Sequence, residues 1–511
     1  MPPFAQGTQP IGPGITELSL AQAPLWALGR VIAVEHPELW GGLIDLDVVD
    51  TIDAAASLFA QIWCSDGEDQ VAFRGGQRYV ARLERYRSLS NEQSVVRLRP
   101  DSTYLITGGL GGIGREIARW MVAQGARHLV LLGRSGMPSS EMDLLLDLER
   151  AGAHVVIEQA DVADREQVAR VLANIESSMP PLCGIIHAAG VLDDGMLRQQ
   201  TWERFAGVQA SKAAGAWNLH LLTLQKSLDF FVLFSSVASV LGSAGQGNYA
   251  VANAFLDTLA HYRRSLGLPA MSINWGPWAE VGMAARLNQH DEHYWTSHGM
   301  HALTVQQGLQ VLGHILDHNP IQIAALRITW RTFVEHHANR TTQPMFSELL
   351  YTTERWSSDS LTEDSQPDLL NRLTVASPQE RAEILTMHIH NQAAKILGFD
   401  QHVLLDPHQP LSELGLDSLL AIELRNVLRV TLRHSFSATL LIDYPTIDAL
   451  SCYLMRELFD AESVEADSHS KPQAKICHED EDTLSNLSDE GLLKLFDEEL
   501  AAIDASLSKE E

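Results

Sequence analysis

The stretch STYLITGGLGGIGREIARWMVAQG (102–125) decides the fold. A short run rich in β-branched and aromatic residues leads into a glycine-rich turn, and an amphipathic helix pattern follows the turn. Glycines allow a tight bend and a close approach of the backbone to a ligand, and a helix N-terminus favours the negative charge of a pyrophosphate. A structural turn without a ligand is the alternative, but the order strand, turn, helix favours a dinucleotide site.

The same alternation continues along residues 102–280. Strands are predicted at 102–107, 128–134, 154–161, 182–190, 229–236 and 270–276, and helices at 114–125, 141–152, 164–175, 211–223 and 248–266. Alternating strands and helices predict an α/β fold, here a Rossmann-like, doubly wound parallel sheet with helices on both faces.

The predicted cofactor contacts follow the first four strands. They are Thr107, Gly108, Gly109, Leu110, Gly111, Gly112, Ile113 and Gly114, then Arg134 and Ser135, then Asp161 and Val162, and finally Ala188, Ala189 and Gly190. Sites for NAD usually place an acid about 20 residues after the glycines, and Arg134 stands there instead, which suits the 2′-phosphate of NADP. Arg134 as a solvated surface residue is the alternative. Asp161 either accepts from the adenine amino group or caps the next helix.

Length, charge and cysteine content exclude several classes of protein. The 511 residues suggest three or four domains of about 150 residues. A net charge of −28 argues against nucleic acid and anionic membrane as partners. No apolar run approaches the ~20 residues of a membrane span, and the N-terminus lacks a signal-peptide pattern. The four cysteines lie in no paired motif, which favours the reducing cytoplasm, and no metal site is predicted.

Four polar residues form a candidate catalytic group. Ser236 ends a predicted strand, and Tyr249 and Asn253 follow on one face of a predicted helix, because they are four residues apart. Ketone reduction needs a proton donor at the oxygen, and a phenol can serve if a nearby cation lowers its pKa. Lys212 is the candidate cation.

Residues 100–345 resemble a short-chain dehydrogenase/reductase, and more narrowly the ketoreductase domain of a modular type I polyketide synthase. The wider family has Tyr-x-x-x-Lys with an upstream Asn, whereas Tyr249 and Asn253 here pair with an upstream Lys212, as is typical of polyketide synthase ketoreductases. The resemblance implies that Tyr249 protonates the developing alkoxide and that Ser236 binds the carbonyl oxygen. Lys212 would lower the Tyr249 pKa and hold the nicotinamide ribose, and Asn253 would anchor a proton-relay water. A catalytically dead homologue is the alternative.

Leu192, Asp193 and Asp194 resemble the fingerprint of B-type ketoreductases, which produce a D-configured 3-hydroxyl. A-type members carry a Trp eight residues before the catalytic Tyr, where this chain has Leu241. Both features predict a B-type enzyme. The alternative is that the two aspartates simply cap the next segment.

LGLDSLLAIELRN (414–426) resembles the phosphopantetheine attachment motif of acyl carrier proteins. The resemblance implies that Ser418, at the start of a helix, carries a 4′-phosphopantetheine arm added by a phosphopantetheinyl transferase. An ordinary N-cap made by Asp417 or Ser418 is the alternative.

The predicted organisation has six parts. They are a partial structural subdomain (1–99), a catalytic subdomain (100–345), a linker (346–378), a four-helix carrier bundle (379–458), a flexible tether (459–482) and a docking helix (483–511). An upstream synthase chain or a missing N-terminal segment would complete the first subdomain. The acidic C-terminal helix would bind a downstream synthase module, or serve only as a solubilising tail.

The expected function is therefore NADPH-dependent reduction of a β-ketoacyl thioester, held on the arm of Ser418, to a 3-hydroxyacyl thioester in polyketide biosynthesis. One alternative is a carrier and docking scaffold whose reductase is vestigial, because half of the first subdomain is missing. Another is a stand-alone reductase of free small ketones, which a carrier motif in the same chain argues against.

Overall fold

The computed structural model describes most of the chain up to residue 459. The described ranges are 17–46, 51–63, 66–86, 97–135, 142–282, 295–296, 299–330, 332–333, 343–354, 369–397, 399, 405–416, 418–432, 434, 436–437 and 440–459. The predicted docking helix and nearly all of the predicted tether lie outside these residues.

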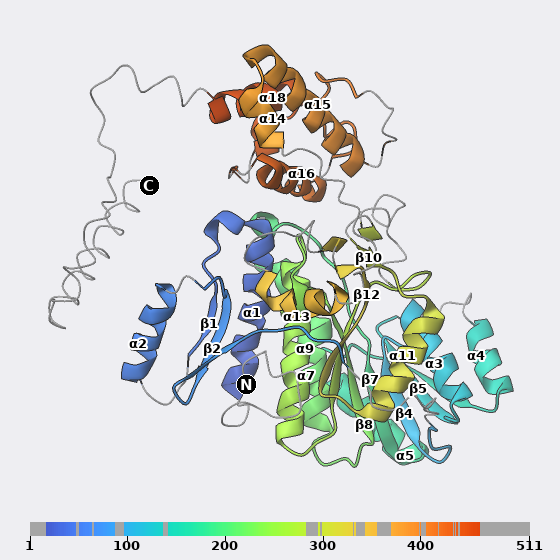
Figure 1. The fold of residues 1–511 in the computed structure, drawn as a ribbon. Coiled ribbons are helices and arrows are strands. Elements are labelled where there is room, and N and C mark those ends of the chain that lie inside the picture. Colours follow the sequence, from blue (N-terminus) through green and yellow to red (C-terminus); the bar gives the residue numbers. More distant parts are fainter. Residues whose placement is uncertain are drawn as a thin grey trace. The chain divides into compact units, whose positions relative to one another are not determined.

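A seven-stranded parallel sheet forms the centre of the catalytic subdomain (Figure 1). Its strands are β4 (Thr103–Thr107), β5 (His128–Gly133), β6 (His154–Gln159), β7 (Leu182–His187), β8 (Phe230–Ser236), β9 (Met271–Trp275) and β11 (Gln322–Ala325). The order β11-β9-β8-β7-β4-β5-β6 reverses direction between β4 and β7, and every pair is parallel. In open α/β sheets, ligands bind at the carboxyl ends of the strands at such a reversal.

Alternate residues of the strands pack on opposite faces. Tyr104 and Ile106 pack with α3 (Gly112–Ala123), α4 (Met142–Arg150) and α11 (Val305–His318). Leu105, between them in sequence, faces the opposite layer. That layer contains α5 (Arg165–Ser178), α7 (Gly215–Leu222) and α9 (Gly247–Ser265). Since both faces are covered, β4 is buried along its whole length, and the predicted doubly wound fold is confirmed.

A smaller three-stranded sheet lies in the N-terminal region, between β1 (Leu43–Asp45), β2 (Gln70–Arg74) and β3 (Gln77–Val80). β1 and β2 are parallel, whereas β2 and β3 are antiparallel. Helix α2 (Thr51–Ile62) connects β1 to β2, and α1 (Glu17–Glu35) precedes the sheet. Ala27 and Val31 of α1 are fully buried in one cluster with residues of α9, so α1 packs directly on the catalytic subdomain.

Part of the predicted linker is a helix. α13 (Gln343–Glu354) buries Met345, Phe346 and Leu349 in a cluster with Trp330 and Phe333. The apolar residues at 345, 346 and 349 have helical spacing, so this segment packs as part of the catalytic subdomain and does not act as a connection. The start of the predicted linker, 346–378, therefore overlaps this packed helix.

Helices also form in the predicted carrier region. They are α14 (Leu369–Val375), just before it, and α15 (Pro378–Ile396), α16 (Ser418–Leu432), α17 (Leu440–Asp443) and α18 (Ile447–Phe459) within it. His388 of α15 hydrogen-bonds Thr431 of α16, and Thr386 of α15 hydrogen-bonds Ser451 of α18. Within the described part of the chain, no helix is long and apolar enough to cross a membrane.

Candidate active site

The glycine-rich turn joins β4 to α3 at the reversal in strand order. Gly108 has φ +68, and a side chain there would meet the backbone of Ala188 and Ala189 at 2.9 Å. A side chain at Gly114 would lie 2.3 Å from the Gly108 carbonyl oxygen. Both positions thus require glycine, for backbone geometry and for close packing of helix on turn. The turn fits the predicted dinucleotide site.

The structure places the remaining predicted cofactor residues at neighbouring strand ends. Arg134 and Ser135 follow β5 and are exposed to solvent. Asp161 follows β6, and its side chain accepts from the backbone N–H of Ala163 at 2.9 Å. Asp164 is the N-cap of α5, where it accepts from Glu166 and Gln167. The alternative that Asp161 caps this helix is therefore wrong.

His187 connects the glycine-rich turn to the segment that carries Lys212. The imidazole is fully buried, with Nδ1 2.7 Å from Thr107 Oγ1 and Nε2 3.0 Å from the Lys212 carbonyl oxygen. A carbonyl only accepts, so Nε2 carries the proton and Thr107 donates to Nδ1. Burial, assisted by the charge of Lys212, lowers the pKa of His187 to about 3, so the ring stays neutral.

Lys212 lies in a π-helical turn, Ala210–Ala214, between α6 (Trp202–Gln209) and α7. Such turns occur often at functional sites. Its Nζ donates to the Phe234 carbonyl oxygen at 2.8 Å and lies 5.2 Å from the centre of the Tyr249 ring. A side chain at Gly190 would meet Lys212 Cε at 2.9 Å, so the glycine leaves room for the lysine. Burial lowers the Lys212 pKa to about 7, although the charge of Asp257 opposes the shift.

Tyr249 and Asn253 of α9 lie next to the end of β8, which carries Ser236. Tyr249 and Asn253 lie one turn apart in α9 and are buried, and Ser236 is the last residue of β8. Asn253 Nδ2 donates to the Tyr249 carbonyl oxygen at 2.8 Å, and Ser236 Oγ accepts from the backbone N–H of Ala238 at 3.2 Å. Asn253 Oδ1 is buried and, among the described residues, has no hydrogen-bond partner, which fits the expected anchor for a water molecule.

The predicted lowering of the Tyr249 pKa is not found in the structure. Burial raises this pKa to about 12, the charge of Asp194 adds to the rise, and the hydrogen bonds with Asn253 and Ser236 oppose it. Lys212 is itself only partly charged near neutral pH, because burial lowers its pKa. The phenol therefore stays protonated, which is the form that a proton donor requires.

A buried carboxylate, Asp257, lies behind the site and was not predicted from the sequence. Its oxygens accept from Ser239 and Ser272 at 2.7 and 2.6 Å and from Asn274 Nδ2 at 2.8 and 2.9 Å. Ser239 Oγ and Asn274 Nδ2 also lie within hydrogen-bond distance of the Ser236 carbonyl oxygen, at 2.8 and 3.3 Å, so these donors are shared between that oxygen and Asp257. The network therefore fixes the end of β8, where Ser236 lies.

We expect Asp257→Ala to lower the free energy of unfolding by about 3–5 kcal/mol, because it leaves several buried donors without an acceptor. Urea denaturation of the full chain would measure the change. Asp257→Asn, which keeps one carbonyl acceptor, is the matched control and should cost less. An unfolding midpoint unchanged in Asp257→Ala would contradict a stabilising role for the network.

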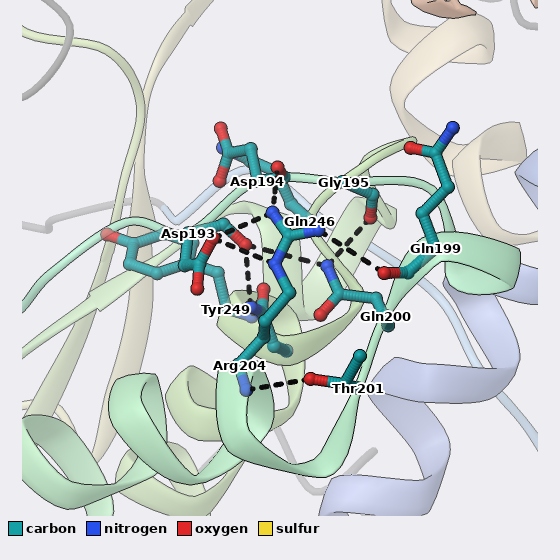
Figure 2. A network of polar contacts seen from close by, with 10 residues as sticks. Asp193, Asp194, Gly195, Gln199, Gln200, Thr201, Arg204, Gln246 and Tyr249 are labelled. Carbon is teal, nitrogen blue, oxygen red and sulfur yellow. Dashed lines mark hydrogen bonds and ion pairs between the residues drawn. The ribbon is translucent and has the colours of Figure 1, made fainter.

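Figure 2 shows the loop that carries Asp193 and Asp194 beside Tyr249. Arg204 of α6 donates to Asp193 Oδ1 at 2.7 and 2.9 Å and to the Asp194 carbonyl oxygen at 2.6 Å. Gln246 donates to Asp194 Oδ2 at 3.0 Å. Met196 is the N-cap of the next helical turn, Leu197–Gln199. The alternative that Asp193 and Asp194 cap that segment is therefore wrong.

Leu192 and Leu241 differ in environment. Leu192 is 37% exposed at the start of the same loop. Leu241 ends α8 (Ala238–Leu241) and is buried in a cluster with Trp330 and Phe346. In the carrier region, Ser418 is the first residue of α16, as the motif predicts.

The sheet has this strand order and a glycine-rich turn at the reversal, and buried Lys212, Tyr249 and Asn253 lie near the partly buried Ser236. Together these features define a reductase of the short-chain dehydrogenase/reductase type. Three family models match the chain. They are the KR domain (residues 102–280), the phosphopantetheine attachment site (388–454) and the Rossmann fold domain of the polyketide synthase extender module SpnB (5–83).

Known proteins resemble the chain over most of its length. Polyketide synthase GfsA of Streptomyces halstedii is 36% identical over 86% of this chain. A solved structure of A-type ketoreductases from a modular polyketide synthase is 40% identical, with a TM-score of 0.61 and coverage of 66% of this chain and 71% of that one. The first ketoreductase of the tylosin synthase is 36% identical, with a TM-score of 0.59 and coverage of 66% and 72%.

The chain belongs to the modular type I polyketide synthases and comprises a ketoreductase and an acyl carrier domain. The reductase is of the short-chain dehydrogenase/reductase type. Membership implies NADPH as reductant and 4′-phosphopantetheine on the carrier. Three of the curated relatives are matched over only 6%, 8% and 29% of their own length.

Proposed function

We propose that this chain reduces the β-keto group of an acyl thioester, held on the phosphopantetheine arm of its own carrier domain, to a 3-hydroxyacyl thioester. The observation that carries the proposal is the convergence of Lys212, Ser236, Tyr249 and Asn253 at the sheet reversal. The same convergence argues against a vestigial reductase. Tethering raises the effective concentration of the substrate, so weak intrinsic affinity suffices.

The residues of the turn fit NADPH. The turn from Gly108 to Gly114 lets a pyrophosphate approach the N-terminus of α3, and the exposed Arg134 guanidinium suits a 2′-phosphate. Asp161 and Val162 would border the adenine, and Lys212 the nicotinamide ribose. When bound, NADPH supplies the hydride for the carbonyl carbon.

The protein's own groups act on the carbonyl oxygen. Tyr249 donates its proton to the oxygen as negative charge develops there, and a pKa of about 12 keeps the phenol protonated until that moment. Ser236 donates a second hydrogen bond, so the charge forms against donors already in place. Asn253 Oδ1, which has no partner in the described part of the chain, would hold the water that returns a proton to Tyr249.

We propose B-type stereochemistry on the basis of Leu192, Asp193 and Asp194, and of the leucine at position 241. The similarity to A-type structures does not oppose this, because the proposal depends on these few residues and not on the overall fold. With a β-ketoacyl thioester and NADPH, we expect the D-configured 3-hydroxyacyl product, which chiral chromatography identifies. An L-configured product would contradict the B-type assignment, and the absence of any product would contradict the reductase.

Partners follow from the same organisation. A phosphopantetheinyl transferase would modify Ser418, and residues 483–511 would bind a downstream module in the cytoplasm. The acidic composition of that C-terminal segment supports a partner with a basic rim.

A further inference from the structure

Helix α1 of the N-terminal subdomain brings a buried carboxylate to the active-site loops. Glu35, the last residue of α1, is only 1% exposed. Its Oε2 accepts from the backbone N–H of Leu197, and its Oε1 from the backbone N–H of Gly245, both at 2.8 Å. These donors lie 162 and 210 residues further along the chain. One side chain therefore holds two distant loops.

One of these loops carries residues of the proposed substrate site, and the other leads directly to one. The first, 192–197, contains Asp193 and Asp194, and the second, 242–246, leads into α9 and Tyr249. The loops also touch directly, since Gly195 N–H donates to the Gly245 carbonyl oxygen at 2.7 Å. Gln246 and Asp194 form a further bond between them, visible in Figure 2. The position of Asp193 and Asp194 relative to Tyr249 thus depends on how these loops are joined.

Only a carboxylate satisfies both loops at once. Each N–H needs an acceptor, and Glu35 offers one oxygen to each. A glutamine would have to point its amide NH₂ at one of the two donors, and that contact would be lost. A buried carboxylate is costly, so its presence here is better explained by geometry than by stability.

We propose that Glu35 is a positioning residue for the substrate: it fixes the Leu192–Asp194 segment relative to Tyr249 and so influences which face of the ketone is presented. The inference rests on the proposed function, because it assigns both loops to a β-ketoacyl substrate. Through Glu35, the N-terminal subdomain becomes part of the substrate site.

Glu35→Gln in the full chain tests the proposal. We expect a KM for a diffusible β-ketoacyl thioester raised about tenfold or more, a lower ratio of D to L product, and an unchanged KM for NADPH. Asp69→Asn is the matched control, because Asp69 is another buried carboxylate of the same subdomain, bonded to Trp40 and to neither loop. A wild-type KM and product ratio in Glu35→Gln would overturn the proposal. The same rise in KM and the same fall in the ratio of D to L product in Asp69→Asn would also overturn it.

Amide hydrogen exchange supplies a second measurement that needs no substrate. Glu35→Gln should exchange faster at both the 192–197 and the 242–246 segments, whereas Asp69→Asn should leave both protected. Unchanged protection in Glu35→Gln would also overturn the role of Glu35. If the wild-type chain reduced no β-ketothioester, the proposed function would fail, and exchange alone would decide whether Glu35 joins the loops.

Discussion

Replacement of Tyr249 by Phe is expected to reduce the rate of β-ketothioester reduction by at least about 100-fold, because it removes only the proton donor. The aromatic ring belongs to a buried cluster that includes Ala250, Ala254 and Val31, and phenylalanine keeps this apolar packing. Steady-state NADPH oxidation with a β-ketothioester would measure the loss. NADPH binding, followed by its fluorescence, should be unchanged, since the glycine-rich turn is untouched.

Tyr262→Phe is the matched control for this experiment. Tyr262 lies in the same helix but packs against Trp217 and His220, away from the site. We expect wild-type activity from it, and similar thermal unfolding of both variants. A Tyr249→Phe enzyme that reduced the substrate at the wild-type rate would show that another group supplies the proton.

Replacement of Ser418 by Ala is expected to abolish phosphopantetheinylation completely, because alanine has no hydroxyl to form the phosphodiester. Intact mass spectrometry after incubation with coenzyme A and a phosphopantetheinyl transferase should show no added group. Reduction of a carrier-bound substrate would then be lost. Reduction of a diffusible β-ketothioester should continue, since the ketoreductase residues are separate from this serine.

Ser412→Ala is the control for the carrier experiment. Ser412 is an exposed serine of the same region, and its backbone carbonyl, not its hydroxyl, accepts from Gly415. We expect full modification of this variant. Modification that persisted in Ser418→Ala would place the attachment site on another residue.

Much of the catalytic subdomain was predictable because its signals are local. Each strand from β4 to β9 is a short apolar run, and the glycine-rich turn, the Tyr249 and Asn253 pair and the Ser418 motif can each be identified within a few residues. The short strand β11, QIAA, gives a weak pattern, and its parallel pairing with β9 depends on the completed sheet. The local sequence therefore does not predict this strand.

The supporting residues were not predictable because their partners are far away. Glu35, Arg204 and Asp257 are charged residues in helical patterns, and such residues usually face solvent. Their roles depend on contacts across the folded chain, which no local spacing reveals. The predicted direction of the Tyr249 pKa shift is wrong for a similar reason. The rise in pKa caused by burial of the phenol is larger than the lowering caused by its hydrogen bonds.

The packing of α1 on the catalytic subdomain has a consequence during synthesis on the ribosome. Arg30 of α1 donates to the carbonyl oxygen of Ser239, which is 209 residues later. At about 5–20 residues per second, roughly 10–40 s pass between the translation of these two residues. During this interval the apolar face of α1 has no partner from α9. The nascent chain is therefore most exposed to misfolding and aggregation before α9 has left the ribosome, and slower translation of residues 36–265 would lengthen that period.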